Sequence, residues 1–141
     1  MAPSSPLYPF LHDEPDSCMS NITTSDLYRS SKVSANLYRK EHSEGGHADG
    51  WAMGPREVEL AACETFFMRE PRAEGDALFP MLPTFTESDE FEEKLRWWLV
   101  HPEAASDVAR LARVAIEDRT FTRTASRLLR IVERSEKRVA A

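Results

Sequence analysis

The segment GWAMGPREVE, residues 50–59, combines glycines, a proline and charged side chains in an order that suits anion binding. Proline favours the first position of a helix, so Pro55 predicts that a helix begins there. The first N–H groups of a helix lack internal partners, and the helix dipole adds partial positive charge beside them. Glycines let a ligand approach the backbone closely. The segment therefore predicts a phosphate-binding loop at a helix N-terminus.

Two charged side chains of this segment suit a nucleotide diphosphate. Arg56 can hold a diphosphate through parallel hydrogen bonds. Glu59 follows on nearly the same helix face, where a carboxylate can accept hydrogen bonds from the two hydroxyls of a ribose. The pattern is also typical of an ordinary loop before an amphipathic helix, with Arg56 and Glu59 paired on the surface, and periodicity alone favours this simpler interpretation. Glu57 is expected to be an exposed charge in the first helical turn.

Predicted strands and helices flank this segment on both sides. The strands are residues 33–38, whose apolar side chains alternate, and residues 65–68, which are β-branched and aromatic. The helices are residues 25–32, with Ser25 as the expected cap, and residues 56–63. This order predicts an α/β fold with a partial Rossmann-like layer, in which the loop lies between a strand and a helix.

A loop and three helices are expected to complete the chain. Residues 70–86 predict the loop because they contain several prolines. Apolar residues then recur at the helical period in three successive segments. Thr86 is the expected cap of the first helix, with Asp89 three residues on. One of Trp97 and Trp98 must point away from the main apolar stripe of this helix.

Composition and charge exclude several classes of protein. The 141 residues allow one domain, with residues 1–24 as an extended or poorly ordered lead-in and residues 25–141 as the domain. A formal net charge of −6 argues against a nucleic-acid binder. The basic residues 119–138 alternate with apolar ones, which favours a solvated helix face over a weaker DNA-binding alternative. No membrane span or signal peptide is expected. The two cysteines, Cys18 and Cys63, do not form a CxxC pair, so no structural zinc site is expected. They favour a reducing, cytoplasmic setting.

The segment also carries a family resemblance. It resembles the glycosyltransferase family that includes the spore maturation protein CgeB and, more distantly, the C-terminal domain of group 1 glycosyltransferases. The helical tail is similar to theirs too, and the resemblance covers about residues 25–134. The residues that carry it are 27–29, 36–39, 50–63, 90–99, 101–103 and 119–129.

The resemblance implies the GT-B architecture, in which two Rossmann-like domains face each other across a cleft. A nucleotide-diphosphate sugar donor lies mainly on the C-terminal domain of such enzymes. By resemblance, Glu59 contacts the donor ribose, and Trp51, Met53, Gly54 and Arg56 contact the diphosphate and sugar. The donor is a co-substrate, and no metal or other cofactor is implied, because the helix dipole and basic side chains stabilise the leaving diphosphate.

Three departures limit what the resemblance implies. Trp51 stands where the group 1 pattern has a second glutamate, so the sugar contacts must differ. Glu64 stands where the family usually has a glycine that makes a tight turn into the next strand. The segment before residue 25 is too short for an acceptor domain. The chain is therefore expected to be truncated, a fragment, split subunit or remnant, and its catalytic residues stay unknown.

The expected function is donor binding by a glycosyltransferase-like protein. Transfer of the sugar to an unknown acceptor, as a hexosyltransferase does, is expected only with a missing N-terminal domain or a partner chain. A protein partner or homo-oligomer is expected to cover the incomplete sheet, because unpaired strand edges need cover. The alternative is a non-catalytic structural or interaction protein derived from a glycosyltransferase domain.

Overall fold

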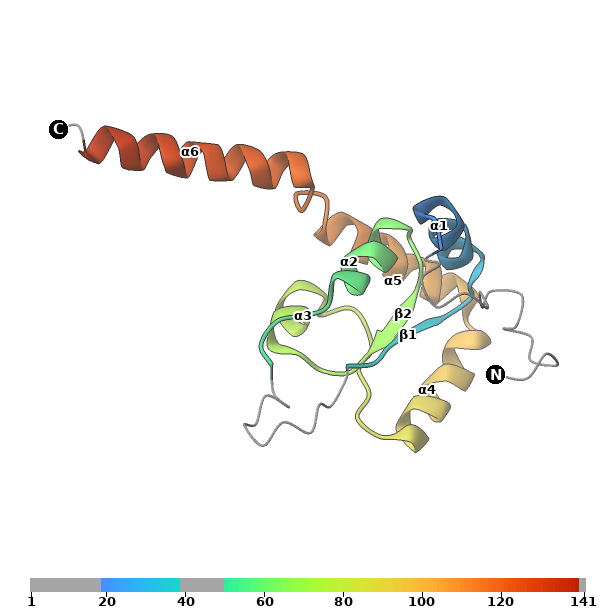
Figure 1. Cartoon of the computed structure of the whole chain (residues 1–141). Coiled ribbons are helices and arrows are strands. Elements are labelled where there is room, and N and C mark those ends of the chain that lie inside the picture. The colour runs from blue at the N-terminus through green and yellow to red at the C-terminus, as the bar shows by residue number, and fades with distance from the viewer. Residues whose placement is uncertain (1–18, 39–49, 140–141) are drawn as a thin grey trace.

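The computed structural model describes residues 19–38 and 50–139, without the side chains of residues 136–139. Most of the expected lead-in lies outside these residues. The part of the loop before residue 50 that contains His42 and His47 also lies outside them. The elements are α1 (Asn21–Ser30), β1 (Ser34–Asn36), α2 (Pro55–Ala62), β2 (Phe67–Arg69), α3 (Ala73–Leu78), α4 (Ser88–Leu99), α5 (Pro102–Ala115) and α6 (Phe121–Val139). The predicted α/β class, partial Rossmann-like with three helices at the end, is confirmed (Figure 1).

A small parallel sheet forms the centre of the fold. Strands β1 and β2 pair in parallel, with Asn36 opposite Arg69. An extended segment lies on the other side of β2, where the Arg69 N–H donates to the Pro83 carbonyl at 3.2 Å and the Phe85 N–H donates to the Arg69 carbonyl at 3.0 Å. Strand β2 thus lies between two extended segments, which explains why all of its residues are buried.

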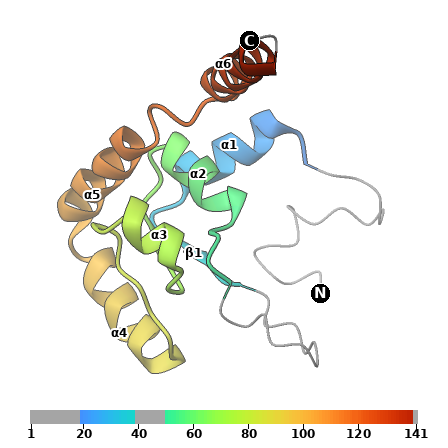
Figure 2. The ribbon, with the colours of Figure 1, turned by 90° about the vertical axis from the view of Figure 1, so that its left-hand side faces the viewer.

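Helices cover this sheet and enclose the apolar core. Helix α2 contacts β1 and α5, and α5 also contacts α4. Figure 2 shows α1 beside α2, on the other side of the strands from α4. Small alanines on the inner face of α5 let it approach α2 closely. The fully buried apolar side chains include Leu60, Ala61, Phe67, Met68, Phe79 and Ala112.

The two adjacent tryptophans of α4 have different surroundings. The ring of Trp98 lies 4.4 Å from the ring of Phe66 and packs against the core. The side chain of Trp97 is 49% exposed, and its ring stacks on His101 at 4.0 Å. The prediction that one tryptophan points away from the apolar stripe is confirmed, and Trp97 is that residue.

The turn between α2 and β2 is tight although it contains no glycine. Glu64 has φ 53°, in the left-handed region. The Glu64 N–H donates to the Ala61 carbonyl and the Thr65 N–H donates to the Leu60 carbonyl, both at 3.0 Å. This pair of hydrogen bonds defines a Schellman motif, in which glycine normally takes the left-handed position. The tight turn that was expected to need glycine is therefore made here by a glutamate in the left-handed conformation.

The predicted loop at residues 70–86 was wrong in one part, because it contains α3. Pro71 and Pro80 lie outside this short helix and do not interrupt it. Glu74 and Asp76 lie in its first turn, where acidic side chains interact favourably with the helix dipole. The prolines thus flank a short helix and do not mark an uninterrupted loop.

Helix α1 begins earlier than predicted. Its cap is Ser20, whose hydroxyl accepts a hydrogen bond from the Thr23 N–H at 3.1 Å. The expected cap, Ser25, lies inside the helix and donates its hydroxyl to the Ile22 carbonyl at 2.9 Å. Serine suits both positions, so the type of residue alone did not identify the cap.

The start of α4 also differs from the prediction. Glu87, not Thr86, occupies the cap position, and Asp89 does not complete a capping box. Instead the Thr86 N–H and hydroxyl both donate to Glu90 Oε2, at 2.8 and 3.2 Å. The hydrogen bond from Lys94, followed by that from the Thr86 N–H, lowers the pKa of Glu90 to about 2.

Strand β1 is shorter than residues 33–38, and its apolar alternation does not mark the core face. Ala35 and Leu37 are exposed, whereas Asn36 between them is buried. A polar side chain is buried without great cost only when it is hydrogen-bonded. Asn36 has such a partner in the site described next.

Candidate functional site

The N-terminus of α2 lies at the carboxyl edge of the parallel strands. The helix follows β1 and runs back towards the start of β2, so its first turn lies near the strand ends at Asn36 and Arg69. Gly54 is its cap residue and Pro55 its first residue, as predicted. Ligands of open α/β sheets bind outside the carboxyl ends of the strands. The fold therefore brings the residue 50–59 segment to the expected kind of position.

A buried carboxylate holds the first turn of α2 to the strands. Glu57 is fully buried, so the prediction of an exposed charge was wrong. Its Oε1 accepts hydrogen bonds from Asn36 Nδ2 at 2.8 Å and from the Tyr38 hydroxyl. Burial, together with the hydrogen bond to Glu57 and the charge of that carboxylate, raises the pKa of the Tyr38 hydroxyl above its ordinary value. Helical spacing could not reveal this contact, because the partners come from a strand about 20 residues away.

Arg69 supplies a compensating positive charge beneath the site. It is 1% exposed, and its Nη2 forms an ion pair with Asp76 Oδ1 at 2.6 Å. A Cβ added to Gly75 would lie 2.8 Å from Arg69 Nη1 and 3.1 Å from Glu57 Oε2. The glycine backbone of α3 therefore approaches both charged groups closely. Glu57 Oε2 has no hydrogen-bond partner among the described residues, and the ion pair of Arg69 is with Asp76.

The loop before α2 is fastened to α3 by its backbone. The Met53 N–H donates to Glu74 Oε2 at 3.1 Å, and the Glu74 N–H donates to the Trp51 carbonyl at 3.0 Å. Arg72 Nη1 donates to the Gly50 carbonyl at 2.8 Å, and its guanidinium lies over the Tyr38 ring at 4.4 Å. These contacts fix the described part of the loop against the body.

The predicted site residues fall into two groups. Trp51, Met53, Gly54 and Arg56 lie together at the N-terminus of α2. Within this group the Trp51 side chain is 65% exposed, Arg56 is exposed, and Met53 is partly buried against the core. Glu59 is also exposed, but it lines a separate hollow of about 280 Å³ between α2 and α1. No ion pair joins Arg56 to Glu59, both described residues, so the simple surface pair does not form.

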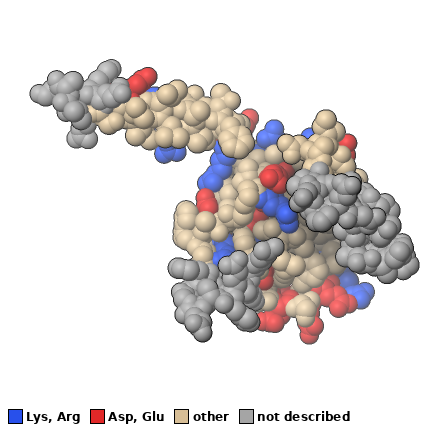
Figure 3. Space-filling view, viewed as in Figure 1, with Lys and Arg blue, Asp and Glu red and all other residues tan. Residues whose placement is uncertain are grey.

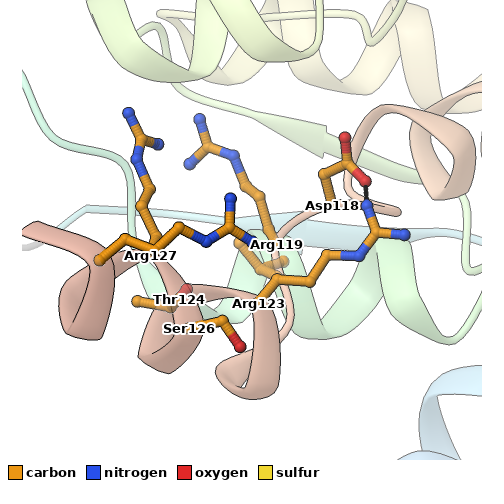
Figure 4. Close-up of a pocket in the computed structure, with 8 residues that line it drawn as sticks. Asp118, Arg119, Arg123, Thr124, Ser126 and Arg127 are labelled. Carbon is orange, nitrogen blue, oxygen red and sulfur yellow. Dashed lines mark ion pairs between the residues drawn. The ribbon is translucent and has the colours of Figure 1, made fainter.

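A larger cavity lies between α6 and α2, and the sequence interpretation missed it. Its volume is about 920 Å³, and its lining includes Val58 of α2 with Arg119, Arg123, Arg127 and Arg130 (Figure 4). The arginines had been assigned to a solvated helix face. Their spacing of four, four and three residues was a usable signal, because it places them on one side of a helix.

The described residues contain no metal-binding group and no membrane-spanning helix. No set of three or more His, Cys, Asp or Glu side chains among them is arranged to hold a metal ion. None of the helices in the same residues is long and apolar enough to cross a membrane. The arrangement that is present is a helix N-terminus at the carboxyl edge of parallel strands, with an exposed arginine in its first turn.

Comparison with known proteins gives the family. A family model described as glycosyl transferase-like matches residues 18–130. This match covers most of the chain and includes all the described strands and the loop before α2, so the chain belongs to the glycosyl transferase-like family. Neither the curated proteins nor the solved structures gave a match.

Proposed function

We propose that the chain binds the diphosphate of a nucleotide-sugar donor at the N-terminus of α2. The observation that carries this proposal is the first turn of α2. Gly54 offers it no side-chain acceptor, and the Arg56 side chain is exposed beside it. An anion can accept hydrogen bonds from such a helix terminus and from a guanidinium at once. Membership of the glycosyl transferase-like family supports a nucleotide diphosphate as that anion.

The proposed roles of the other site residues follow the CgeB-like and group 1 resemblance. Trp51 and Met53 contact the sugar, and Glu59 accepts hydrogen bonds from the donor ribose. The exposed carboxylate of Glu59 in a hollow is compatible with a ligand, and Ser25 and Tyr28 of α1 line the same hollow. The helix dipole and Arg56 stabilise the leaving diphosphate without a metal.

The proposed reaction is transfer of the sugar within a GT-B enzyme, with residues 25–141 as its donor-binding unit. A second domain or a partner chain supplies the acceptor site, and no catalytic base is assigned to this chain. A cytoplasmic setting is part of the proposal, and the free thiol of the partly buried Cys63 supports it.

Calorimetric titration with a panel of nucleotide-diphosphate sugars tests donor binding. We expect Arg56→Ala and Glu59→Ala each to weaken binding about tenfold, because each removes a charged hydrogen-bonding group. Arg113→Ala and Glu103→Ala are matched controls, since both side chains are exposed on α5, away from α2's first turn. Absence of binding by the wild-type chain, alone and with candidate partner chains, would contradict the proposal.

A second candidate function is a non-catalytic interaction protein. The observation that favours it is the apolar surface of α6, which extends away from the rest of the molecule (Figure 1). Phe121 is 96% exposed, Leu129 63% and Ile131 58%. Apolar surface of this kind commonly marks a protein interface. Light scattering tests this candidate, since a monodisperse monomer that captures no partner at high concentration would count against it.

A further inference from the structure

Helix α6 concentrates positive charge in an acidic protein. Residues 121–139 contain six basic and two acidic residues, a net charge of +4 in a chain of net charge −6. Figure 3 shows basic side chains where α6 meets the body, and acidic side chains over α4. Helix α6 therefore carries a net positive charge in an acidic chain, next to the cavity between α6 and α2.

The basic and apolar residues of α6 occupy different sides of the helix. Arg123, Arg127 and Arg130 of α6 line the cavity together with Arg119, which lies just before the helix, and the four are called here the arginine groove. Leu128 and Val132 are among the exposed apolar residues, and their positions in the helical repeat lie on the side away from the arginines. In an isolated globular protein an amphipathic helix normally turns its apolar face to the body. Here the charged face borders the cavity, which indicates that the cavity accommodates something polar.

Two of the four arginines of the groove form ion pairs with carboxylates of the same chain. Arg123 forms an ion pair with Asp118, and Arg119 Nη1 forms one with Glu74 Oε1 at 3.2 Å. Neither Arg127 nor Arg130 forms an ion pair or side-chain hydrogen bond with any residue that the structure describes. Figure 4 shows the guanidinium groups of Arg119 and Arg127 extending in the same direction. Like charges held on one helix face repel each other unless an anion lies between them.

The chemistry of the groove selects a phosphate ligand. Guanidinium groups bind phosphate oxygens through paired, charge-assisted hydrogen bonds. Arg127 and Arg130 lie one turn apart, so their guanidinium groups can hold two linked phosphates. A cavity of about 920 Å³ has room for a diphosphate and for the group attached to it. We propose that the arginine groove is a binding site for a diphosphate-bearing ligand.

This site is separate from the proposed donor site. The α2 residue that lines the groove is Val58, whereas Arg56 does not line it. The two sites are joined through Glu74, whose Oε1 accepts from Arg119 and whose Oε2 accepts from the Met53 N–H. The groove does not depend on the proposed donor role of Arg56, and its variants lie on another helix.

Titration of the whole chain with inorganic pyrophosphate tests the groove. We expect Arg127→Ala with Arg130→Ala to weaken pyrophosphate binding about tenfold or more, because charge-assisted hydrogen bonds from two side chains are lost. The double variant Arg127→Lys with Arg130→Lys keeps the charge. Its affinity for pyrophosphate should lie between those of the wild type and the alanine variant, because lysine lacks the paired donors of arginine. Both arginines project from an exposed helix outside the core, so circular dichroism should show an unchanged fold.

A charge-matched control separates a site from general attraction. Arg96→Ala with Arg110→Ala removes the same charge from exposed positions of α4 and α5. We expect it to bind pyrophosphate as the wild type does. If this control weakens binding as much as the groove variant, or if the wild type binds no pyrophosphate, the proposal is overturned. Loss of binding in Arg56→Ala but not in the groove variant would also overturn it, while leaving the donor proposal intact.

Two further probes identify the source of the diphosphate. Competition by a nucleoside diphosphate, abolished in the groove variant, would support a soluble ligand. Cosedimentation with vesicles of phosphatidylcholine and diacylglycerol pyrophosphate, abolished in the same variant, would support the diphosphate of a lipid headgroup. Pyrophosphate binding that neither probe displaces nor reproduces would mean that the groove takes small anions only, which contradicts a ligand with an attached group.

Discussion

Asn36 Nδ2 donates a hydrogen bond of 2.8 Å to Glu57 Oε1, and this bond joins the end of β1 to the first turn of α2. Both side chains are buried. Tyr38 adds a second donor to the same oxygen, and Arg69 lies close to the other oxygen across Gly75. The position of the proposed donor site therefore depends on these buried polar groups, while Trp51, Arg56 and Glu59, which are proposed to contact the ligand, are exposed.

Removing the buried carboxylate should destabilise the fold. Glu57→Ala leaves the buried Asn36 amide and the Tyr38 hydroxyl without their acceptor, and we expect the free energy of unfolding to fall by about 3 kcal/mol. Urea denaturation measures the change. Glu59→Ala is the matched control, two residues further along the same helix but exposed, and it should change stability by less than about 0.5 kcal/mol. Equal effects of the two substitutions would contradict the buried role of Glu57.

Stability should fall at alkaline pH because of Tyr38. Its pKa is raised in the folded chain, so the folded state keeps the hydroxyl proton at a pH where the unfolded chain, with an ordinary pKa of 10.0, has lost it. The stabilisation is therefore fully present below pH 10 and decreases as the pH rises above it. Denaturation of the wild type and of Tyr38→Phe between pH 8 and 11 measures this difference. Parallel curves for the two proteins would show that Tyr38 does not contribute.

Gly75 should not tolerate a methyl group. A Cβ there would lie 2.8 Å from Nη1 of the buried Arg69, so Gly75→Ala should lower the free energy of unfolding by about 1–3 kcal/mol. At Gly54 the nearest atom to a new Cβ is Tyr38 Cε1 at 3.8 Å, an ordinary contact. Gly54→Ala is therefore the control, with an expected loss of about 1 kcal/mol or less from the changed cap. Thermal unfolding of both variants tests whether Gly75→Ala loses more stability than Gly54→Ala. A larger loss for Gly54→Ala would contradict the prediction.

Placing glycine at residue 64 should stabilise the protein. Glu64 has φ 53°, a conformation that costs a residue with a Cβ roughly 1 kcal/mol. Glu64→Gly should raise the free energy of unfolding by about 0.5–1 kcal/mol, whereas Glu64→Ala keeps the strain and should not. Denaturant unfolding of the two variants separates backbone strain from loss of the side chain. If alanine stabilises as much as glycine, the strain is not the cause.

Local rules predicted the parts of the fold whose signals lie close together in the sequence. Pro55 marked the start of α2, and the three successive segments with apolar residues at the helical period marked the last three helices. Glu57 was misplaced because its first-turn position suits an exposed charge, and only its contacts with β1 and α3 show that it is buried. The same reason explains the β1 face, since the burial of Asn36 depends on Glu57.

The candidate sites, like the fold, could be predicted only where their residues are close together in the sequence. The sequence order alone brought Trp51, Met53, Gly54 and Arg56 to one helix terminus, because they are neighbours in the chain. The arginine groove required the position of α6 relative to α2, which no periodicity within α6 contains. The hollow beside Glu59 likewise depends on α1, a helix some 30 residues earlier in the sequence.

Neighbouring residues in the first turns of α2 meet different requirements, one for stability and the other for the proposed ligand contacts. Glu57 points inward and is committed to the fold, whereas Arg56 and Glu59, on either side of it, point into solvent and carry little of the stability. Substitutions at these two outer positions should therefore change the ligand preference of the proposed donor site without needing a stabilising substitution elsewhere. Laboratory evolution of a new specificity at the proposed donor site should therefore begin at those outer positions.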